Sequence, residues 1–252
     1  MALDYYNNGI DEIVFMDAVA AYYDRNSLSD LIQKACADVY IPITVGGGLR
    51  SIADIKEVLR VGADKVCLNT AAIKNPQFIK KASRMFGSST IVVAIEAIRE
   101  ENGKYLAYTD NGREYTGIDV FEWAQKIDEL GAGEIVITSV DREGTGQGYD
   151  SELISKLSKL VSIPIIAHGG AGNKDHVIEV LKNDDINAAM ISSLFHYDFI
   201  KENLSKSSSL EGNTEFLKQK RDFHTFKPCS IIDLKEKLVK NKIQCRLWWT
   251  KK

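Results

Sequence analysis

Three segments of the chain recur in its second half, each shifted by 122 or 123 positions. The segments are 9–15, 41–48 and 62–69, and their counterparts are 131–137, 163–170 and 185–192, the last pair being the weakest match. A shift that stays constant over three strand-like segments indicates a fused, duplicated half, and such a repeat constrains a fold more than any local signal. In each half a Gly-Gly turn follows an apolar run, so we expect two equivalent anion sites that face each other.

Short apolar runs alternate with amphipathic stretches along most of the chain. The runs are β-branched and nearly continuous in hydrophobicity, as expected for parallel strands buried on both faces. The predicted strands are 12–17, 41–45, 65–69, 91–96, 134–138, 163–167 and 187–192. The predicted helices are 27–38, 51–61, 75–85, 118–130, 150–161, 174–183 and 230–241, with Ser51, Asn75 and Asp150 as caps. This alternation predicts a parallel sheet with right-handed crossovers, interrupted by a hairpin-like loop at 97–117.

The repeat also indicates where an eighth strand belongs. The predicted fold class is an α/β, (β/α)8 TIM barrel with a two-fold half-barrel repeat, and such a barrel needs one strand more than the seven predicted. The counterpart of strand 91–96 falls before residue 1, so the first strand is missing from the chain. Because a lost strand leaves two unpaired sheet edges, we expect an N-terminal truncation rather than a true loss. The predicted organisation is a barrel over 1–197, a polar insertion over 198–228, and a C-terminal helix and tail over 229–252.

Charge and composition exclude several classes of function. The formal net charge of -3 and the pI near 5.9 give no footprint for nucleic acid. No apolar run is long enough to span a bilayer, so we expect no membrane association. The four cysteines have neither paired nor metal-like spacing, which favours a reducing, cytoplasmic compartment. We expect no metal and no cofactor.

The Gly-rich turns are the first candidates for chemistry. A Gly-rich turn between a strand and a helix directs backbone N–H groups and a helix N-terminus at an anion. One such turn alone is more simply a tight connection that needs glycine. Two turns at matched repeat positions, each followed by a strand that ends in polar residues, instead favour a pair of phosphate sites. The residues concerned are Gly47, Gly48, Asn69 and Thr70 in the first half, and Gly169, Gly170, Ser192 and Ser193 in the second.

Charged residues mark both ends of the predicted strands. Glu96 directly ends the apolar run 91–95, where an acid is costly unless it is used, so it is the candidate acid–base group. Asp17 and Asp141 lie at similar strand ends, and for them a turn-capping role is equally reasonable. At the opposite end, three residues begin strands: Glu12, Lys65 and Glu134. They form either a salt-bridged plug or the gate of an axial passage.

The motifs together resemble a known family, the cyclase subunit of imidazole glycerol phosphate synthase. The resemblance rests on 44–48, 62–72, 141–150 and 165–172, and it covers about 5–197 and 230–247. It implies a duplicated barrel with two phosphate sites and a heterodimer with a glutaminase subunit. That partner would supply ammonia. The cyclase subunit would use it to close the ring of a phosphorylated ribulosyl-formimino nucleotide and cleave it into imidazole glycerol phosphate and AICAR, an intermediate of purine metabolism.

The family's functional residues carry over unevenly. The resemblance implies phosphate-binding roles for Gly47, Asn69, Thr70, Gly144, Gly170, Ser192 and Ser193, a gate of Glu12, Lys65 and Glu134, and contact of Asp64 with the glutaminase. The family has two catalytic aspartates; the first is absent with its strand, and Glu96 stands in place of the second. Glu143 replaces an aspartate near the second phosphate site, and His168 replaces a small residue. A carboxylate moved by about 1 Å can cost on the order of a hundredfold in rate.

We favour the first of three functions and keep the other two as alternatives. The first is the cyclase itself, an enzyme of the lyase class, in which Glu96 is the acid–base residue. The second is an ammonia-channelling paralogue that supports amidation of a sugar in surface polysaccharide synthesis, because the gate is kept while the catalytic acids differ. The third is a non-catalytic scaffold that activates a glutaminase. Complementation of a histidine auxotroph distinguishes the first from the second, and glutaminase stimulation that survives Glu96→Ala would indicate the third.

Overall fold

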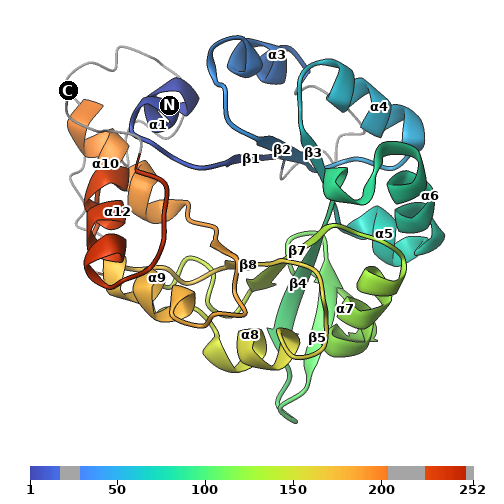
Figure 1. Ribbon diagram of the computed structural model, residues 1–252. Coiled ribbons are helices and arrows are strands. Elements are labelled where there is room, and N and C mark those ends of the chain that lie inside the picture. The colour runs from blue at the N-terminus through green and yellow to red at the C-terminus, as the bar shows by residue number, and fades with distance from the viewer. Residues whose placement is uncertain (18–28, 204–224, 248–252) are drawn as a thin grey trace.

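Seven parallel strands, followed along the ring in Figure 1, form the inner wall of the molecule. The computed structural model describes residues 1–17, 29–203 and 225–247. The strands are β1 (Ile13–Met16), β2 (Ile43–Gly46), β3 (Lys65–Leu68), β4 (Ile91–Arg99), β7 (Glu134–Ser139), β8 (Ile165–His168) and β9 (Ala188–Ala189), and they pair in that order. All seven match the predicted strands to within a few residues, and β9 is much shorter than its prediction. The sheet curls with helices outside it, as in a (β/α)8 barrel.

The strand register repeats at the spacing found in the sequence. Ile13 pairs with Ile43 in the first half, and Ile135 pairs with Ile165 in the second, a shift of 122 on both strands. The next strands pair as Thr44 with Lys65 and Ile166 with Ala188, so β3 and β9 differ by 123. The two spacings thus reflect one extra residue between β8 and β9. The duplicated half is confirmed at the level of individual residue pairs.

Helices connect the strands and cover the outside of the ring. They are α1 (Ala2–Asn7), α3 (Ser29–Asp38), α4 (Ile52–Arg60), α5 (Thr70–Lys74), α6 (Gln77–Phe86), α7 (Val120–Glu129), α8 (Ser151–Leu157), α9 (Lys174–Leu181), α10 (Ser193–Asn203) and α12 (Ile231–Lys240), with a 3-10 turn η1 (Ser88–Thr90). Ser51 and Asp150 cap α4 and α8 with their side chains, as predicted. The cap predicted at Asn75 is wrong, because Pro76 is the N-cap of α6 and Asn75 is the C-cap of α5. No helix in the described ranges could span a membrane.

Two layers of apolar side chains lie on opposite faces of the curled sheet. The larger core fills the space between strands and helices, and Ile91, Val93 and Ile95 of β4 are fully buried there. The alternate residues face inward and make a second cluster of Cys67, Val92, Ala94 and Val136, against which Ile166 and Met190 pack. Because side chains alternate along a strand, this inner cluster identifies which later residues also face the interior.

The segment 97–117 forms the predicted hairpin. Strands β5 (Tyr105–Thr109) and β6 (Glu114–Asp119) pair with each other, and β5 continues the sheet antiparallel to β4. The turn between them holds Asp110 and Asn111 at positive φ, which these residues tolerate better than most. The hairpin thereby returns towards the end of β4.

Helices lie beside the interval between β1 and β9. Among the described residues β1 pairs with β2 and β9 pairs with β8, with no strand between the two outer edges. Helices α1 and α10 lie side by side in Figure 1, and Tyr5 of α1 makes edge contacts with Phe195 and Phe199 of α10. Lys235 of α12 forms an ion pair with Asp11, just before β1, at 2.6 Å.

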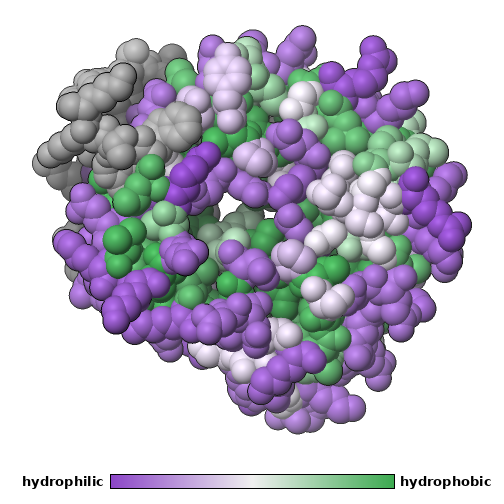
Figure 2. Space-filling model, in the orientation of Figure 1, coloured by the Kyte–Doolittle hydropathy of each residue, from purple (hydrophilic) through white to green (hydrophobic). Residues whose placement is uncertain are grey.

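The predicted boundary at 198, between the barrel and the polar insertion, falls inside a helix. Helix α10 runs across position 198, where the insertion was expected to begin, so the first six residues of that segment are helical. The remainder of the predicted insertion up to 224, and the end of the tail at 248–252, lie outside the described residues. Figure 2 shows hydrophilic residues gathered around a central opening of the ring.

Candidate active site

Three polar side chains stand in a row at the carboxyl ends of adjacent strands. The register pairs Glu96 of β4 with Thr138 of β7, and Thr138 with His168 of β8. Each lies two positions after a member of the inner cluster or of the residues packed on it, so all three face the barrel interior. The carboxyl ends of barrel strands are where active sites of this architecture lie. The row is therefore the centre of the candidate active site.

Glu96 is held by two elements besides its own strand. Its Oε2 accepts a hydrogen bond from the backbone N–H of Gly112 in the hairpin turn (2.8 Å), and its carboxyl group also hydrogen-bonds the side chain of Asn69. Burial raises the pKa of Glu96, the bonds from Gly112 and Asn69 oppose the rise, and the charges of Glu143 and Asp110 add to it. The net effect is a raised pKa, which keeps a proton on this carboxyl group at higher pH than on an exposed one.

Asn69 brings an unused hydrogen-bond acceptor to the same place. Its Oδ1 is buried and has no hydrogen-bond partner among the described residues. A buried acceptor without a donor costs free energy. An N–H or O–H group of a bound ligand would supply the missing donor and recover that cost. The sequence predicted Asn69 as a phosphate-binding residue, and the structure adds its side-chain contact with Glu96.

His168 is fixed by its neighbour on β7. The Thr138 Oγ1 and the His168 Nδ1 lie 3.0 Å apart. Burial lowers the pKa of His168, and the negative charge of Glu143 only partly opposes this. A histidine in this setting stays neutral near pH 7. In the part of the chain that the structure describes, no group of His, Cys, Asp and Glu residues is arranged to hold a metal ion.

The two Gly turns have the same geometry in both halves. Gly47 and Gly169 both adopt positive φ, 95° and 90°, and Gly48 and Gly170 follow at 70° and 105°. A Cβ on Gly47 or Gly169 would come within 3.0 Å of the backbone of the preceding strand end, at Asp17 or Ser139. Glycine is required at these positions because a side chain would be both strained and obstructed.

Each turn is accompanied by a helix start on the next strand. The Asn69 carbonyl accepts from Ile73 N at the start of α5, and the Ser192 carbonyl accepts from His196 N at the start of α10. The first N–H groups of Thr70 and Ser193 are therefore directed out of the helix, where they can bind an anion. Gly144 lies in the loop after β7 with open space above its α-carbon. The predicted phosphate-binding residues thus gather at the same rim in two groups.

The three charged residues predicted at the other end of the barrel form one cluster. Lys65 Nζ bonds Glu134 Oε1 at 2.6 Å and Glu12 Oε2 at 3.0 Å. Burial lowers the pKa of Lys65, but the hydrogen bonds and charges of both carboxylates outweigh burial, so its pKa is raised and it stays charged. The arrangement is a salt-bridged plug in this state, placed below the apolar inner cluster.

Asp64, predicted to contact a partner, has a structural role as well. Its carboxylate accepts from Ile43 N at 2.8 Å, and in the second half the Asn187 side chain accepts from Ile165 N at 3.0 Å. The same backbone donor is therefore satisfied in both halves, once by an acid and once by an amide. The hydrogen bond needs an acceptor oxygen and not a negative charge.

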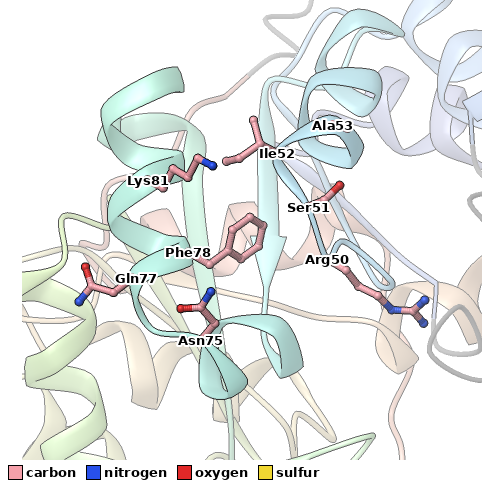
Figure 3. A pocket seen from close by; sticks show the side chains of 8 residues that line it. All are labelled: Arg50, Ser51, Ile52, Ala53, Asn75, Gln77, Phe78 and Lys81. Carbon is pink, nitrogen blue, oxygen red and sulfur yellow. The ribbon is translucent and has the colours of Figure 1, made fainter.

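A surface pocket lies away from this centre. It sits between α4 and α6, and its lining is Arg50, Ser51, Ile52, Ala53, Asn75, Gln77, Phe78 and Lys81 (Figure 3). Figure 3 shows the Arg50 side chain extending away from Phe78. A capping box closes the start of α4, because the Asp54 carboxylate accepts from Arg50 N and Ser51 N while the Ser51 hydroxyl accepts from Asp54 N.

The sequence missed two contributors to the site. Gly112 was seen only as part of a turn, and Thr138 only as a strand residue. The Asp-Asn-Gly sequence at 110–112 does predict a tight turn, but it does not show that the turn folds back onto Glu96. Thr138 could have been predicted as a site residue. It is polar, ends its predicted strand and lies two positions after the inward-facing Val136, so it must also face inward.

Comparison with known proteins places this chain in a family. The model of the family described as histidine biosynthesis protein matches residues 1–201. The chain belongs to the histidine biosynthesis protein family. Over 171 residues it is 53% identical to the imidazole glycerol phosphate synthase subunit HisF of Legionella pneumophila, covering 68% of this chain and 81% of that protein. Over 193 residues it is 47% identical to the subunit of the same name from Bacillus cereus strain Q1, covering 77% of each.

Membership of this family decides between the functions that the sequence left open. Relatives at about half identity are imidazole glycerol phosphate synthase subunits, so the similarity supports a cyclase subunit, an enzyme of the lyase class. It does not favour the sugar-amidation paralogue or the non-catalytic scaffold.

Proposed function

We propose that the chain condenses ammonia with a phosphorylated ribulosyl-formimino nucleotide and releases imidazole glycerol phosphate and AICAR. The observation that carries this proposal is the position of Glu96, an inward-facing acid with a raised pKa at the catalytic rim. Ring closure and cleavage require proton transfers, and a carboxyl group whose pKa is shifted towards neutrality performs them best. Glu96 is the proposed acid–base residue.

The two groups of phosphate-binding residues hold the ends of the substrate. A substrate with a phosphate at each end would span the rim from the turn Gly47-Gly48 to the turn Gly169-Gly170. Thr70 and Ser193 each add the N–H groups of a helix start, and Glu143 and Gly144 border the second site. Matched anchors on opposite sides support a substrate phosphorylated at both ends. Asn69, with its free acceptor, lies beside the acid between them.

The opposite end of the barrel is the proposed entry for ammonia. The Lys65 cluster covers the bottom, and above it lie Cys67, Val92 and Val136. An apolar passage favours neutral ammonia over ammonium, because a charged ion would lose its hydration there. A glutaminase subunit docked at this end, in contact with Asp64, would supply the ammonia. A cytoplasmic location suits the four cysteines, which are all free thiols.

Product analysis tests the proposal directly. The purified chain is incubated with the ribulosyl-formimino nucleotide and an ammonium salt, without any glutaminase, and products are identified by mass spectrometry. We expect imidazole glycerol phosphate and AICAR in equal amounts, formed at a rate that rises with the concentration of free ammonia at a fixed pH. A folded protein that binds the nucleotide but forms neither product contradicts the proposal. Stimulation of a glutaminase by such a protein would instead support the scaffold.

A further inference from the structure

The two halves of the barrel differ at one matched register position. In the first half Met16 pairs with Gly46, and in the second half Thr138 pairs with His168. A Cβ on Gly46 would come within 3.0 Å of the Met16 sulfur and of the Cys67 Cβ, so the first half has no space for a side chain there. The second half carries an imidazole at the same position. The chemistry of the rim is therefore not symmetric, although the backbone is.

His168 is set up to exchange protons through one nitrogen. The contact between its Nδ1 and the Thr138 hydroxyl fixes the ring orientation, which leaves Nε2 as the exchanging atom. Burial favours the neutral ring, and Glu143, in the loop after β7, is the charged group that opposes this. On the other side β9 leads to Met190, which packs in the barrel interior and does not titrate.

Glu96 and His168 are complementary in position and in protonation. They lie two strands apart, which corresponds to about 10 Å between their backbones, enough for a substrate carbonyl group between the side chains. Their surroundings shift the two pKa values towards a protonated carboxyl group and a neutral imidazole. Shifts in these directions favour the carboxyl group as the acid and the imidazole as the base of such a pair.

We propose that His168, oriented by Thr138, is the second proton-transfer group of the site and works with Glu96 when ammonia condenses with the substrate carbonyl. The proposal rests on the cyclase function proposed above. It assigns to this histidine a part in the reaction that a small residue at the same position could not take.

The proton balance of the condensation fits such a pair. Ammonia and a carbonyl group form a C=N bond and water, so two protons leave nitrogen and two arrive at the oxygen. In the first transfer the neutral imidazole takes a proton from nitrogen while the Glu96 carboxyl group gives one to oxygen. In the second, the carboxylate takes a proton from nitrogen and the imidazolium gives one to the departing oxygen. Both residues return to their starting state, and no other reactant is needed.

The test compares His168→Asn with the unaltered protein at saturating ammonia. Asparagine keeps a polar contact for Thr138 but cannot titrate. We expect kcat to fall about a hundredfold, since one general acid–base group typically contributes 10²–10⁴, while KM for the nucleotide changes less than about threefold. The unaltered protein should lose rate at low pH, as the imidazole is protonated, and at high pH, as Glu96 ionises. In His168→Asn the rate should no longer fall at low pH but should still fall at high pH. His196→Asn, on α10, is the control and should keep both.

The outcomes separate this inference from the function on which it rests. If the unaltered protein turns over and His168→Asn has the same kcat and the same pH profile, the inference is wrong and the cyclase function stands. If the unaltered protein forms no product, the cyclase function fails and the inference fails with it. A second measurement needs no variant: imidazole resonances in nitrogen NMR should show His168 neutral at pH 7 and shifted by bound product. A cationic ring at pH 7 would overturn the inference.

Discussion

Asp64 has a structural hydrogen bond and a proposed contact with a partner, and the two roles can be told apart. Its carboxylate accepts from the backbone of Ile43, which is 1% exposed, while Asn187 serves the equivalent strand of the other half. Because a neutral amide does the same work, the negative charge of Asp64 is not required by the fold. The charge is then available for the proposed contact with a glutaminase.

Two substitutions at Asp64 separate these roles. Asp64→Asn keeps the acceptor, so we expect the free energy of unfolding to change by less than about 0.5 kcal/mol. Asp64→Ala leaves the Ile43 N–H without an acceptor and should cost about 1–3 kcal/mol in urea unfolding, as should Asn187→Ala. Asp64→Asn should nonetheless weaken binding of the glutaminase. Equal destabilisation by Asn and Ala would show that the fold does depend on the charge.

Among the elements, the strand-to-helix turns carry the strictest requirement on residue type. Gly47 and Gly169 combine positive φ with a close approach to the backbone of a neighbouring strand end. Gly87 has nearly the same φ, 91°, but has nothing within 4 Å of an added Cβ. It therefore isolates the cost of backbone conformation from the cost of the obstruction.

The loss of stability on substituting alanine at these glycines should follow how closely the new Cβ approaches other atoms, since the three φ angles are nearly equal. Gly87→Ala should destabilise by about 1–3 kcal/mol, the cost of a backbone region (φ 91°, ψ 146°) that residues with a Cβ rarely adopt. Gly47→Ala and Gly169→Ala should each cost at least about 1 kcal/mol more, because the turn must also move away from the strand. Chemical unfolding of the three variants measures this. A Gly47→Ala variant as stable as Gly87→Ala would mean that the turn adapts freely, and the tight turn would lose its structural explanation.

The elements also show what the sequence can and cannot predict. The repeat and the β-branched runs were sufficient for the strands and their order, because parallel strands buried on both faces have an unmistakable composition. Helices α1, α5 and α10 were missed, since the first two are too short, and the third too weakly amphipathic, to give a clear periodic pattern.

Contacts made across the chain were harder to foresee. The Gly112 N–H, in the turn of the hairpin, donates to Glu96. The Thr138 hydroxyl contacts His168 on the neighbouring strand. Neither contact has a local signature, because each depends on sheet register. Glu96 and the Lys65 cluster were predictable because charges at the ends of buried strands are costly enough to stand out.

For the whole molecule, the ring of strands has two chemically different ends. Glu96, His168 and the Gly turns lie at the carboxyl ends of the strands, while the Lys65 salt bridges lie at the amino ends. The apolar inner cluster lies between them. This polarity suits a path that admits ammonia at one end and consumes it at the other. Such a path needs a proton-transfer group where the ammonia is consumed, and Glu96 is the proposed one.

The most direct measurement is the ammonia-dependent rate of Glu96→Gln beside Glu96→Asp and the unaltered protein. Glutamine keeps the size and polarity of the side chain but removes the proton, so we expect kcat to fall at least about a hundredfold with KM for the nucleotide nearly unchanged. Aspartate keeps a carboxyl group, one methylene closer to the backbone, and should retain more activity than glutamine. A Glu96→Gln variant that forms both products at the unaltered rate would contradict the central claim.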